Sequence, residues 1–371
     1  IADRRTTSTR GEAPRVLVVR LSAIGDVLHA LPAVAALRKA RPGAYLAWAV
    51  EDRAAALLEG HPALDRVLVL PRRRWSRAAR RMTGWPAVAS GAGRWIRDLI
   101  GERFDVALDL QGNLKSGLVA WASGAPARYG FSSDAAREGN GFFVNRRVPA
   151  LRGARHKVDR NVALVEACLG ERTAPLPADL PRDPADVAWT DAALLAAGLP
   201  SRGFVVLHPG TSGFGAFKRW PAERFARLAT RIRRDAGVPV AITFGPGEEP
   251  LAEEVRTRAA AVALATPSLR ALAEVLRRAA AFVSGDTGPL HVAAAVGTPV
   301  LGLFGPKDAD VYGPWGRRPD GTSGPLPVLT RADVPCRPCT LRWCPEPVCM
   351  SAIEEDDVLA ALLAQVLRRG A

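Results

Sequence analysis

The sequence has no long apolar run, and two common nucleotide-binding motifs are missing. No stretch approaches the roughly 18 to 20 apolar residues of a membrane-spanning helix, and the first residues are rich in Arg and Thr, without the apolar core of a signal peptide. We therefore expect a cytoplasmic protein whose residues 1–14 are a disordered tail. The first strand is not followed by a Gly-x-Gly-x-x-Gly turn, which disfavours hydride chemistry, and no Walker A loop is present.

Lysine is scarce in a chain that is strongly basic. Only five of the 51 basic residues are lysines, and the net charge is +14. Residues 1–170 hold 28 Lys and Arg against 15 Asp and Glu, whereas residues 171–371 hold 23 against 22. The positive half favours a polyanionic partner such as nucleic acid, an anionic membrane surface or a phosphorylated glycolipid, although a general Arg bias also contributes. Each lysine kept in such a chain marks a position where a compact charge is useful.

The alternation of short apolar runs with helical patterns predicts an α/β protein with a parallel sheet in each half. A chain of 371 residues is long for one core, so two domains are expected. The proline-rich stretch 171–186 suggests the boundary between them. We predict an N-terminal domain over 15–180, a C-terminal domain over 181–350 and a C-terminal helical segment over 351–371.

Polar residues follow the predicted strands of the first half. Asp26 stands in the turn after strand 15–21, where it is a candidate general base or a carboxylate that caps the next helix. Gln111 and Lys115 follow strand 104–110, and Arg137 lies in a later polar loop. We expect these residues at the same edge of the sheet as Asp26, where ligands of open α/β sheets bind.

The second half has two turns suited to phosphate. After strand 204–208 the loop HPGTSGFGAFKRWP contains Thr211, Ser212 and Lys218, and the next strand is followed by Glu248, which could bind a ribose. The other turn, SGDTGPLHVAAA, contains the polar residues Asp286, Thr287, Gly288 and His291. A helix beginning here would offer free backbone N–H groups to an anion, although Asp286 or Thr287 could also simply cap it.

Two further segments stand out. Residues 72–103 contain nine arginines together with Trp75, Trp85 and Trp95, a composition typical of a membrane-surface segment or of a solvated helix packed on the core. Four cysteines lie within fourteen residues, in the order Cys336, Cys339, Cys344 and Cys349. They could form a structural zinc site or remain reduced thiols, and nothing else in the sequence requires a metal.

The blocks RLSAIGDVLHALPA, LDLQGNLKSG, HPGTSGFGAFKRWP and SGDTGPLHVAAAVGTPVLGLFGP together resemble family 9 glycosyltransferases, the lipopolysaccharide heptosyltransferases. The resemblance implies the glycosyltransferase-B fold: two Rossmann-like domains that face each other across a cleft, with a C-terminal helix that crosses back to the N-terminal domain. It also implies a peripheral enzyme on the cytoplasmic face of the inner membrane.

The activity implied is metal-independent, inverting transfer of heptose from ADP-heptose to the Kdo/heptose inner core of lipopolysaccharide or a related anionic glycolipid. By this resemblance Asp26 is the general base, and Thr211 and Lys218 contact the donor phosphates. The acceptor is expected on the N-terminal domain, where it would contact Gln111, Lys115 and Arg137. Asp286, Thr287, Gly288 and His291 match the nucleotide-sugar site. No cofactor and no nucleic acid are then expected.

Two other functions fit parts of the sequence. A nucleotide-sugar 2-epimerase on the same architecture would need no separate acceptor. A non-enzymatic nucleic-acid or membrane-binding module would explain the basic half, but it leaves the two phosphate turns of the second half without a role.

Overall fold

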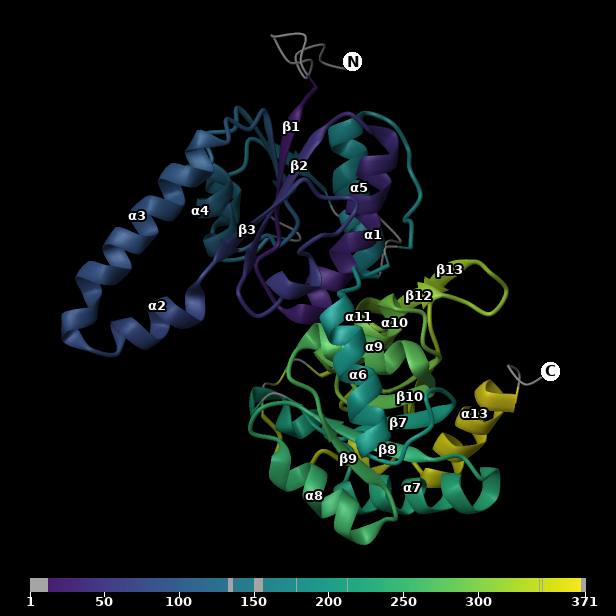
Figure 1. Ribbon diagram of the computed structural model, residues 1–371. Helices are drawn as coiled ribbons and strands as arrows, with labels where there is room; N and C mark the ends of the chain where they lie inside the picture. The colour runs from purple at the N-terminus through teal and green to yellow at the C-terminus, as the bar shows by residue number, and fades with distance from the viewer. Residues whose placement is uncertain are drawn as a thin grey trace. The chain divides into compact units, whose positions relative to one another are not determined.

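The computed structural model describes residues 13–132, 136–149, 156–177, 179–211, 213–339, 341 and 343–367. The chain divides into two compact units, Ile1–Pro181 and Arg182–Ala371. Each unit contains a six-stranded parallel sheet with helices on both faces (Figure 1). The α/β class and the parallel sheet predicted for each half are confirmed. Most of the predicted tail, residues 1–12, lies outside the described residues.

The first unit alternates strands and helices. Its elements are β1 (Arg15–Val19), α1 (Ile24–Ala40), β2 (Tyr45–Glu51), the 3-10 helix η2 (Ala55–Leu57), β3 (Arg66–Leu70), α2 (Arg72–Ala79), η3 (Met82–Gly84), α3 (Trp85–Gly101), β4 (Val106–Asp109), α4 (Leu114–Ala122), β5 (Ala127–Phe131), η4 (Asn140–Phe142), β6 (Arg146–Val148) and α5 (Lys157–Leu169).

The strand order of the first sheet is β3-β2-β1-β4-β5-β6, and its central strands are buried on both faces. Leu17 and Val19 of β1 pack with Leu99 of α3 and Val119 of α4, while α1 packs against α5. The order reverses between β1 and β4, which pair in parallel. Ligands of open α/β sheets bind at the carboxyl ends of strands at such a reversal.

The second unit repeats this plan. Its elements are α6 (Pro184–Ala196), β7 (Phe204–His208), η5 (Gly213–Lys218), α7 (Ala222–Ala236), β8 (Val240–Phe244), α8 (Glu249–Arg258), β9 (Val262–Ala265), α9 (Leu269–Arg278), β10 (Ala279–Gly285), α10 (Gly288–Ala295), β11 (Val300–Leu303), α11 (Ala309–Tyr312), β12 (Trp315–Arg317), β13 (Ser323–Pro325), β14 (Val328–Leu329), α12 (Val348–Ser351) and α13 (Glu355–Leu367).

The second sheet has the order β14-β11-β10-β7-β8-β9, with its reversal between β7 and β10. One face is covered by α7, α8 and α13, whose buried side chains share a core with Val205 and Leu207 of β7. A separate antiparallel pair, β12 and β13, lies beside α10. The phosphate turns predicted from the sequence therefore follow the two strands that flank the reversal.

The C-terminal helix packs on the second unit. The resemblance implies a helix that returns toward the first domain, and the described part of this helix, α13, contacts α7, β10 and β11. Val358, Leu359 and Leu362 are buried in that unit's core, and Arg227 of α7 forms an ion pair with Glu355. Apolar burial and paired charges together hold the described helix on the second sheet.

Candidate functional site

Asp26 lies in the first turn of α1, just beyond the carboxyl end of β1. One carboxylate oxygen is 2.8 Å from a guanidinium nitrogen of Arg20, and the other accepts a hydrogen bond from the ammonium of Lys157 on α5. Asp26 is not the N-cap residue, which is Ala23, although its carboxylate also lies 3.5 Å from the backbone nitrogen of Ala23. Two cations rather than a helix cap are therefore its main partners.

The charge of Asp26 results from two opposing effects. Burial disfavours the carboxylate, but Arg20 and Lys157 outweigh burial and hold the pKa of Asp26 well below its usual range. The side chain still keeps 24% of its surface exposed, so a small polar group can reach it. Asp26 is thus ionised throughout the neutral pH range and can accept a hydrogen bond from a hydroxyl.

Gln111 ties the turn after β4 to the turn after β1. Its side-chain oxygen accepts hydrogen bonds from the backbone nitrogens of Leu21 at 2.8 Å and Ser22 at 3.3 Å. Its own backbone nitrogen donates to Asp109, which is fully buried. Gln111, predicted as an acceptor ligand, therefore supports the turn that leads to Asp26.

Asp109 is the centre of a buried hydrogen-bond network. It accepts from the backbone of Gly112, from the hydroxyl of Ser116 at 2.9 Å and from the side chain of Asn140 at 2.6 Å. Burial raises the pKa of Asp109 against these hydrogen bonds. The network joins the end of β4, the start of α4 and the loop before β6, so it fixes the sheet edge on which Gln111 stands.

The other two predicted acceptor ligands lie near this edge but differ in their surroundings. The ammonium of Lys115 pairs with the buried carboxylate of Glu51, the last residue of β2, which also contacts Arg72 at 3.2 Å. Arg137 has an exposed side chain, and its backbone nitrogen donates to the carbonyl of Gly112 at 2.8 Å. Arg137 is thus open to solvent, whereas Lys115 already neutralises a buried acid.

In the second unit, Lys218 and Asp286 connect the two phosphate turns. The ammonium of Lys218, at the end of η5, lies 2.5 Å from a carboxylate oxygen of Asp286, which follows β10. The other oxygen of Asp286 is 3.8 Å from Nε2 of His291 on α10. Burial opposes the charge of Asp286, but His291 and Lys218 outweigh it and lower the pKa of Asp286 to about 2.

The start of α10 has the features expected of an anion site. Thr287 is the N-cap residue, but its side chain does not cap the helix and instead lies 3.1 Å from the hydroxyl of Ser284. Gly288 is the first helical residue and is followed by Pro289. Because the first backbone N–H groups of a helix lack intrahelical partners, this turn can donate to an anion.

The loop after β7 is held by a residue that the sequence did not single out. Arg219 donates to the hydroxyl of Thr211 and to its carbonyl oxygen, both at 3.0 Å. Thr211 is buried, so Arg219 fixes the loop that precedes Lys218. Ser212, the neighbouring prediction, lies outside the described residues.

Glu248 lies against the same loop. Its carboxylate accepts a hydrogen bond from the backbone nitrogen of Gly245 at 2.8 Å and lies 3.5 Å from Nε2 of His208. A side chain at Gly210 would collide with this carboxylate. Burial lowers the pKa of His208 to about 4, so the imidazole is neutral at pH 7. Glu248 therefore bridges the turns after β7 and β8 beside the other predicted donor ligands.

The four cysteines do not form a metal site in the part of the chain that the structure describes. No group of three or more His, Cys, Asp or Glu residues there could hold a metal ion. All four thiols are free, with Cys349 buried and Cys336 exposed. The carbonyl of Cys339 accepts from Lys307, and its nitrogen donates to Pro306, so the segment packs beside the loop after β11. The described residues therefore give no support to the zinc site considered from the spacing, which stays a prediction.

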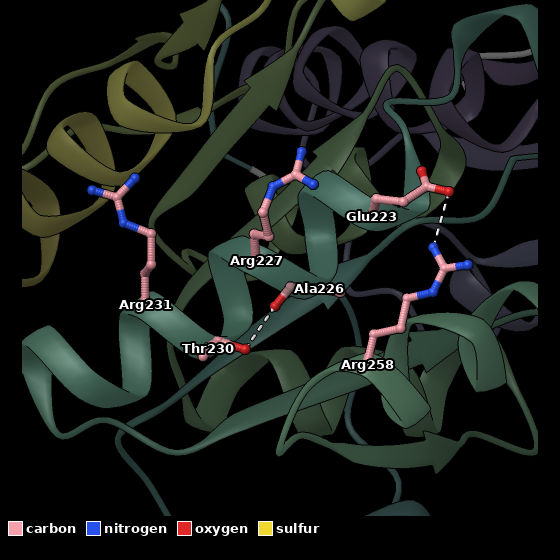
Figure 2. Close-up of a pocket in the computed structure, with 6 residues that line it drawn as sticks. All are labelled: Glu223, Ala226, Arg227, Thr230, Arg231 and Arg258. Atoms are coloured by element: carbon pink, nitrogen blue, oxygen red, sulfur yellow. Dashed lines mark hydrogen bonds and ion pairs between the residues drawn. The ribbon is translucent and has the colours of Figure 1, made fainter.

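A surface hollow lies elsewhere, on α7 and α8 (Figure 2). Its arginines pair with carboxylates: Arg227 with Glu355, and Arg258 with Glu223 at 2.9 Å. None of the predicted site residues lines it. The hollow is therefore a neutralised surface feature rather than the candidate site.

Three of the five lysines pair with acids at the carboxyl edges of the sheets. Lys157 contacts Asp26, Lys115 contacts Glu51 and Lys218 contacts Asp286. The scarcity of lysine drew attention to these residues, and the structure gives each an acidic partner. Nothing in the pattern distinguished Arg20 or Arg219 from the other arginines.

Two parallel sheets, each with polar clusters at its reversal point, define a glycosyltransferase-B type of protein, and comparison with known proteins agrees. The model of glycosyltransferase family 9 (heptosyltransferase) matches residues 92–337. Lipopolysaccharide heptosyltransferase 1 of Pseudomonas aeruginosa is 32% identical over 335 residues, covering 89% of this chain and 87% of the relative. The chain belongs to glycosyltransferase family 9 and is a glycosyltransferase of the heptosyltransferase type.

Solved structures support the same fold. The E. coli heptosyltransferase WaaC with ADP has a TM-score of 0.73 and 26% sequence identity, covering 95% of this chain and 99% of that one. WaaC with ADP-2-deoxy-2-fluoro heptose has a TM-score of 0.68 and 26% identity, covering 96% and 100%. Within the described residues, no helix of this protein is both long and apolar enough to span a bilayer.

Proposed function

We propose that the protein transfers heptose from ADP-heptose to the Kdo/heptose inner core of lipopolysaccharide or a related anionic glycolipid, with inversion and without a metal. The observation that carries this proposal is the Lys218–Asp286–His291 cluster at the start of α10. The solved structures of E. coli WaaC with ADP and with ADP-2-deoxy-2-fluoro heptose favour the same donor here.

The second unit holds the donor in this proposal. Lys218, Thr211 and the free N–H groups at the start of α10 bind the diphosphate, while Ser212 and Glu248 contact the rest of the nucleotide sugar. Asp286 is in hydrogen-bond reach of Lys218, so it orients the ammonium before the donor arrives. As the bond between the anomeric carbon and ADP breaks, these positive groups stabilise the charge that builds on the leaving diphosphate.

The first unit supplies the base and the acceptor contacts. Asp26 accepts the proton of an acceptor hydroxyl while the hydroxyl oxygen attacks the anomeric carbon from the face opposite ADP. Because its pKa is depressed, Asp26 is a weak base, and the proton moves as bond formation makes the hydroxyl more acidic. Gln111, Lys115 and Arg137 help to hold the acceptor, and the basic charge of this half suits its phosphates and carboxylates.

Transfer by the purified protein tests this proposal. ADP-heptose, ADP-glucose, UDP-glucose and GDP-mannose are each offered with a Kdo-bearing lipid acceptor, with and without EDTA, and the linkage of the product is determined by NMR. We expect turnover with ADP-heptose that resists EDTA and gives an inverted anomeric centre. Retention, a need for added divalent cation, or efficient transfer only from another nucleotide sugar would overturn the corresponding part of the proposal.

A further inference from the structure

The outer surface of α3 and α4 in the first unit exposes large apolar side chains. Trp85 is 60% exposed and Ile100 52% on α3, and Trp121 is 58% exposed on α4. Leu114 and Leu118 of α4 are each 43% exposed. Single exposed apolar residues are ordinary, but a group on neighbouring helices marks an interaction surface.

Helical geometry places these residues in two stripes. Leu114, Leu118 and Trp121 are spaced i, i+4 and i+7, so they share one side of α4, opposite the buried Val119 and Ala120. On α3, the exposed residues Trp85, Ile96 and Ile100 fall within roughly 60° of one another at about 100° per residue. The α4 stripe faces away from the core, whereas the α3 stripe borders the core side, since the buried Leu99 lies about 40° from Trp85 around the helix.

The two stripes belong to one helical layer. Leu99 of α3 and Val119 of α4 are buried in the same core on one face of the first sheet, with Trp75 of α2 and Trp95 of α3 packed against it. Helix α3 contacts both α2 and α4, and Figure 1 shows the three helices on the same side of that sheet. Exposed apolar side chains thus lie on two helices of one layer, α3 and α4, beside the arginine-rich α2.

Arginines surround this surface. Residues 72–101 contain eight arginines and one acid, Asp98. Arg73, Arg74, Arg77 and Arg80 have exposed side chains, and within the described residues none of these guanidinium groups forms an ion pair with a carboxylate. These charges are therefore available to an external anion.

We propose that α2, α3 and α4 form a surface that binds an anionic bilayer. The apolar stripes would lie at the headgroup–acyl boundary, and the arginines would bind lipid phosphates. A soluble anion would satisfy the arginines but would leave the apolar stripes in water. A bilayer satisfies both, because Trp favours the interface and basic residues favour anionic headgroups. This inference rests on the proposed function in one respect, since that function puts the acceptor in a membrane.

Sedimentation with vesicles that contain neither acceptor nor donor tests the surface. Equimolar phosphatidylglycerol and phosphatidylcholine vesicles are compared with pure phosphatidylcholine vesicles at low and high salt. Each arginine near an anionic surface contributes roughly fivefold, so Arg73, Arg77 and Arg80 all changed to Gln should weaken binding about a hundredfold and reduce its salt dependence. Leu118→Ser with Trp121→Ser should weaken binding roughly tenfold or more while the salt dependence stays.

The matched control is Leu195→Ser on α6, which removes a leucine that is 81% exposed in the other unit. We expect it to bind vesicles as the wild type does. Unchanged melting temperatures and unchanged transfer to a delipidated, water-soluble acceptor would show that the surface variants are folded and keep the chemistry.

The inference would be overturned if both surface variants bound vesicles as strongly as the wild type does. It would also be overturned if the wild-type protein did not bind anionic vesicles. A variant that lost activity on the soluble acceptor as well as vesicle binding would also overturn it, because the arginines would then bind the acceptor itself. Vesicle binding without any heptose transfer would instead refute the proposed function and leave the surface intact.

Discussion

Replacing Asp286 by Asn should destabilise the second unit, because Asn cannot form the ion pair with Lys218. The pKa of this carboxyl falls from 3.8 to about 2 in the folded protein. At about 1.4 kcal/mol per unit, the ionised form stabilises the fold by about 2 kcal/mol at neutral pH. Because Lys218 has only 21% of its side chain exposed, it would lose its partner in a largely desolvated place. For a unit of this size the loss corresponds to a fall of about 4 to 8 °C in melting temperature.

The pH dependence distinguishes this pair from a general packing defect. A carboxyl whose pKa is depressed contributes stability above its unfolded pKa and loses it as the pH falls through its folded pKa. The difference between wild type and Asp286→Asn should therefore be constant from pH 7 to pH 5, begin to narrow near pH 4, and be about half as large at pH 3. Urea unfolding followed by tryptophan fluorescence measures it at each pH.

Asp357→Asn is the matched control, because Asp357 is exposed on α13 in the same unit. A surface change of this kind should alter stability by about 0.5 kcal/mol or less. The reasoning fails if Asp286→Asn is as stable as wild type at pH 7. It also fails if the deficit is the same at pH 3 as at pH 7, since the loss would then not arise from the carboxylate.

The remaining predictions concern the two lysines beside the proposed catalytic groups. Lys157→Met removes one of the cations that depress the pKa of Asp26, so that pKa should rise toward its usual range and kcat/KM should fall more than in the wild type as the pH is lowered from 7 to about 4. The same fall in both proteins would show that Lys157 does not tune the base. Lys218→Ala should weaken ADP-sugar binding, measured by calorimetry, by about tenfold or more, and Lys218→Arg should recover only part of it because a planar fork replaces a point charge. Full recovery of ADP-sugar binding in Lys218→Arg would show that a compact charge is not required at this position.

Much of the fold could be predicted because its central strands are continuous apolar runs. Residues 204–208 were predicted as a strand and are β7 with the same bounds, while the predicted strands 15–21 and 104–110 contain β1 (Arg15–Val19) and β4 (Val106–Asp109). Edge strands such as β6 and β14 were not predicted, since they are short and their few residues show no apolar pattern. Their position depends on pairing with a neighbouring strand, which local sequence does not encode.

The candidate site was predictable where strand ends carry polar residues. Asp26 and Asp286 follow buried strands, so parallel topology alone brings them to the carboxyl edges of the sheets. Their partners were harder to predict, because Lys157 is 131 residues from Asp26 and Lys218 is 68 residues from Asp286. The role of Lys115 illustrates the same limit: the sequence suggested an acceptor ligand, and only the fold brings it to Glu51.

The measurement that tests the account most directly compares turnover and donor binding in Asp26→Asn. Asn keeps the size of the side chain but cannot accept the proton, so initial rates with ADP-heptose and a Kdo-bearing acceptor should fall by roughly 100-fold or more. The dissociation constant for ADP-heptose should stay at the wild-type value, and Glu59→Gln, an exposed change in the same unit, should leave both quantities unaltered. Normal turnover in Asp26→Asn would contradict the account, because Asp26 would then only pair with Arg20 and Lys157 and support the start of α1.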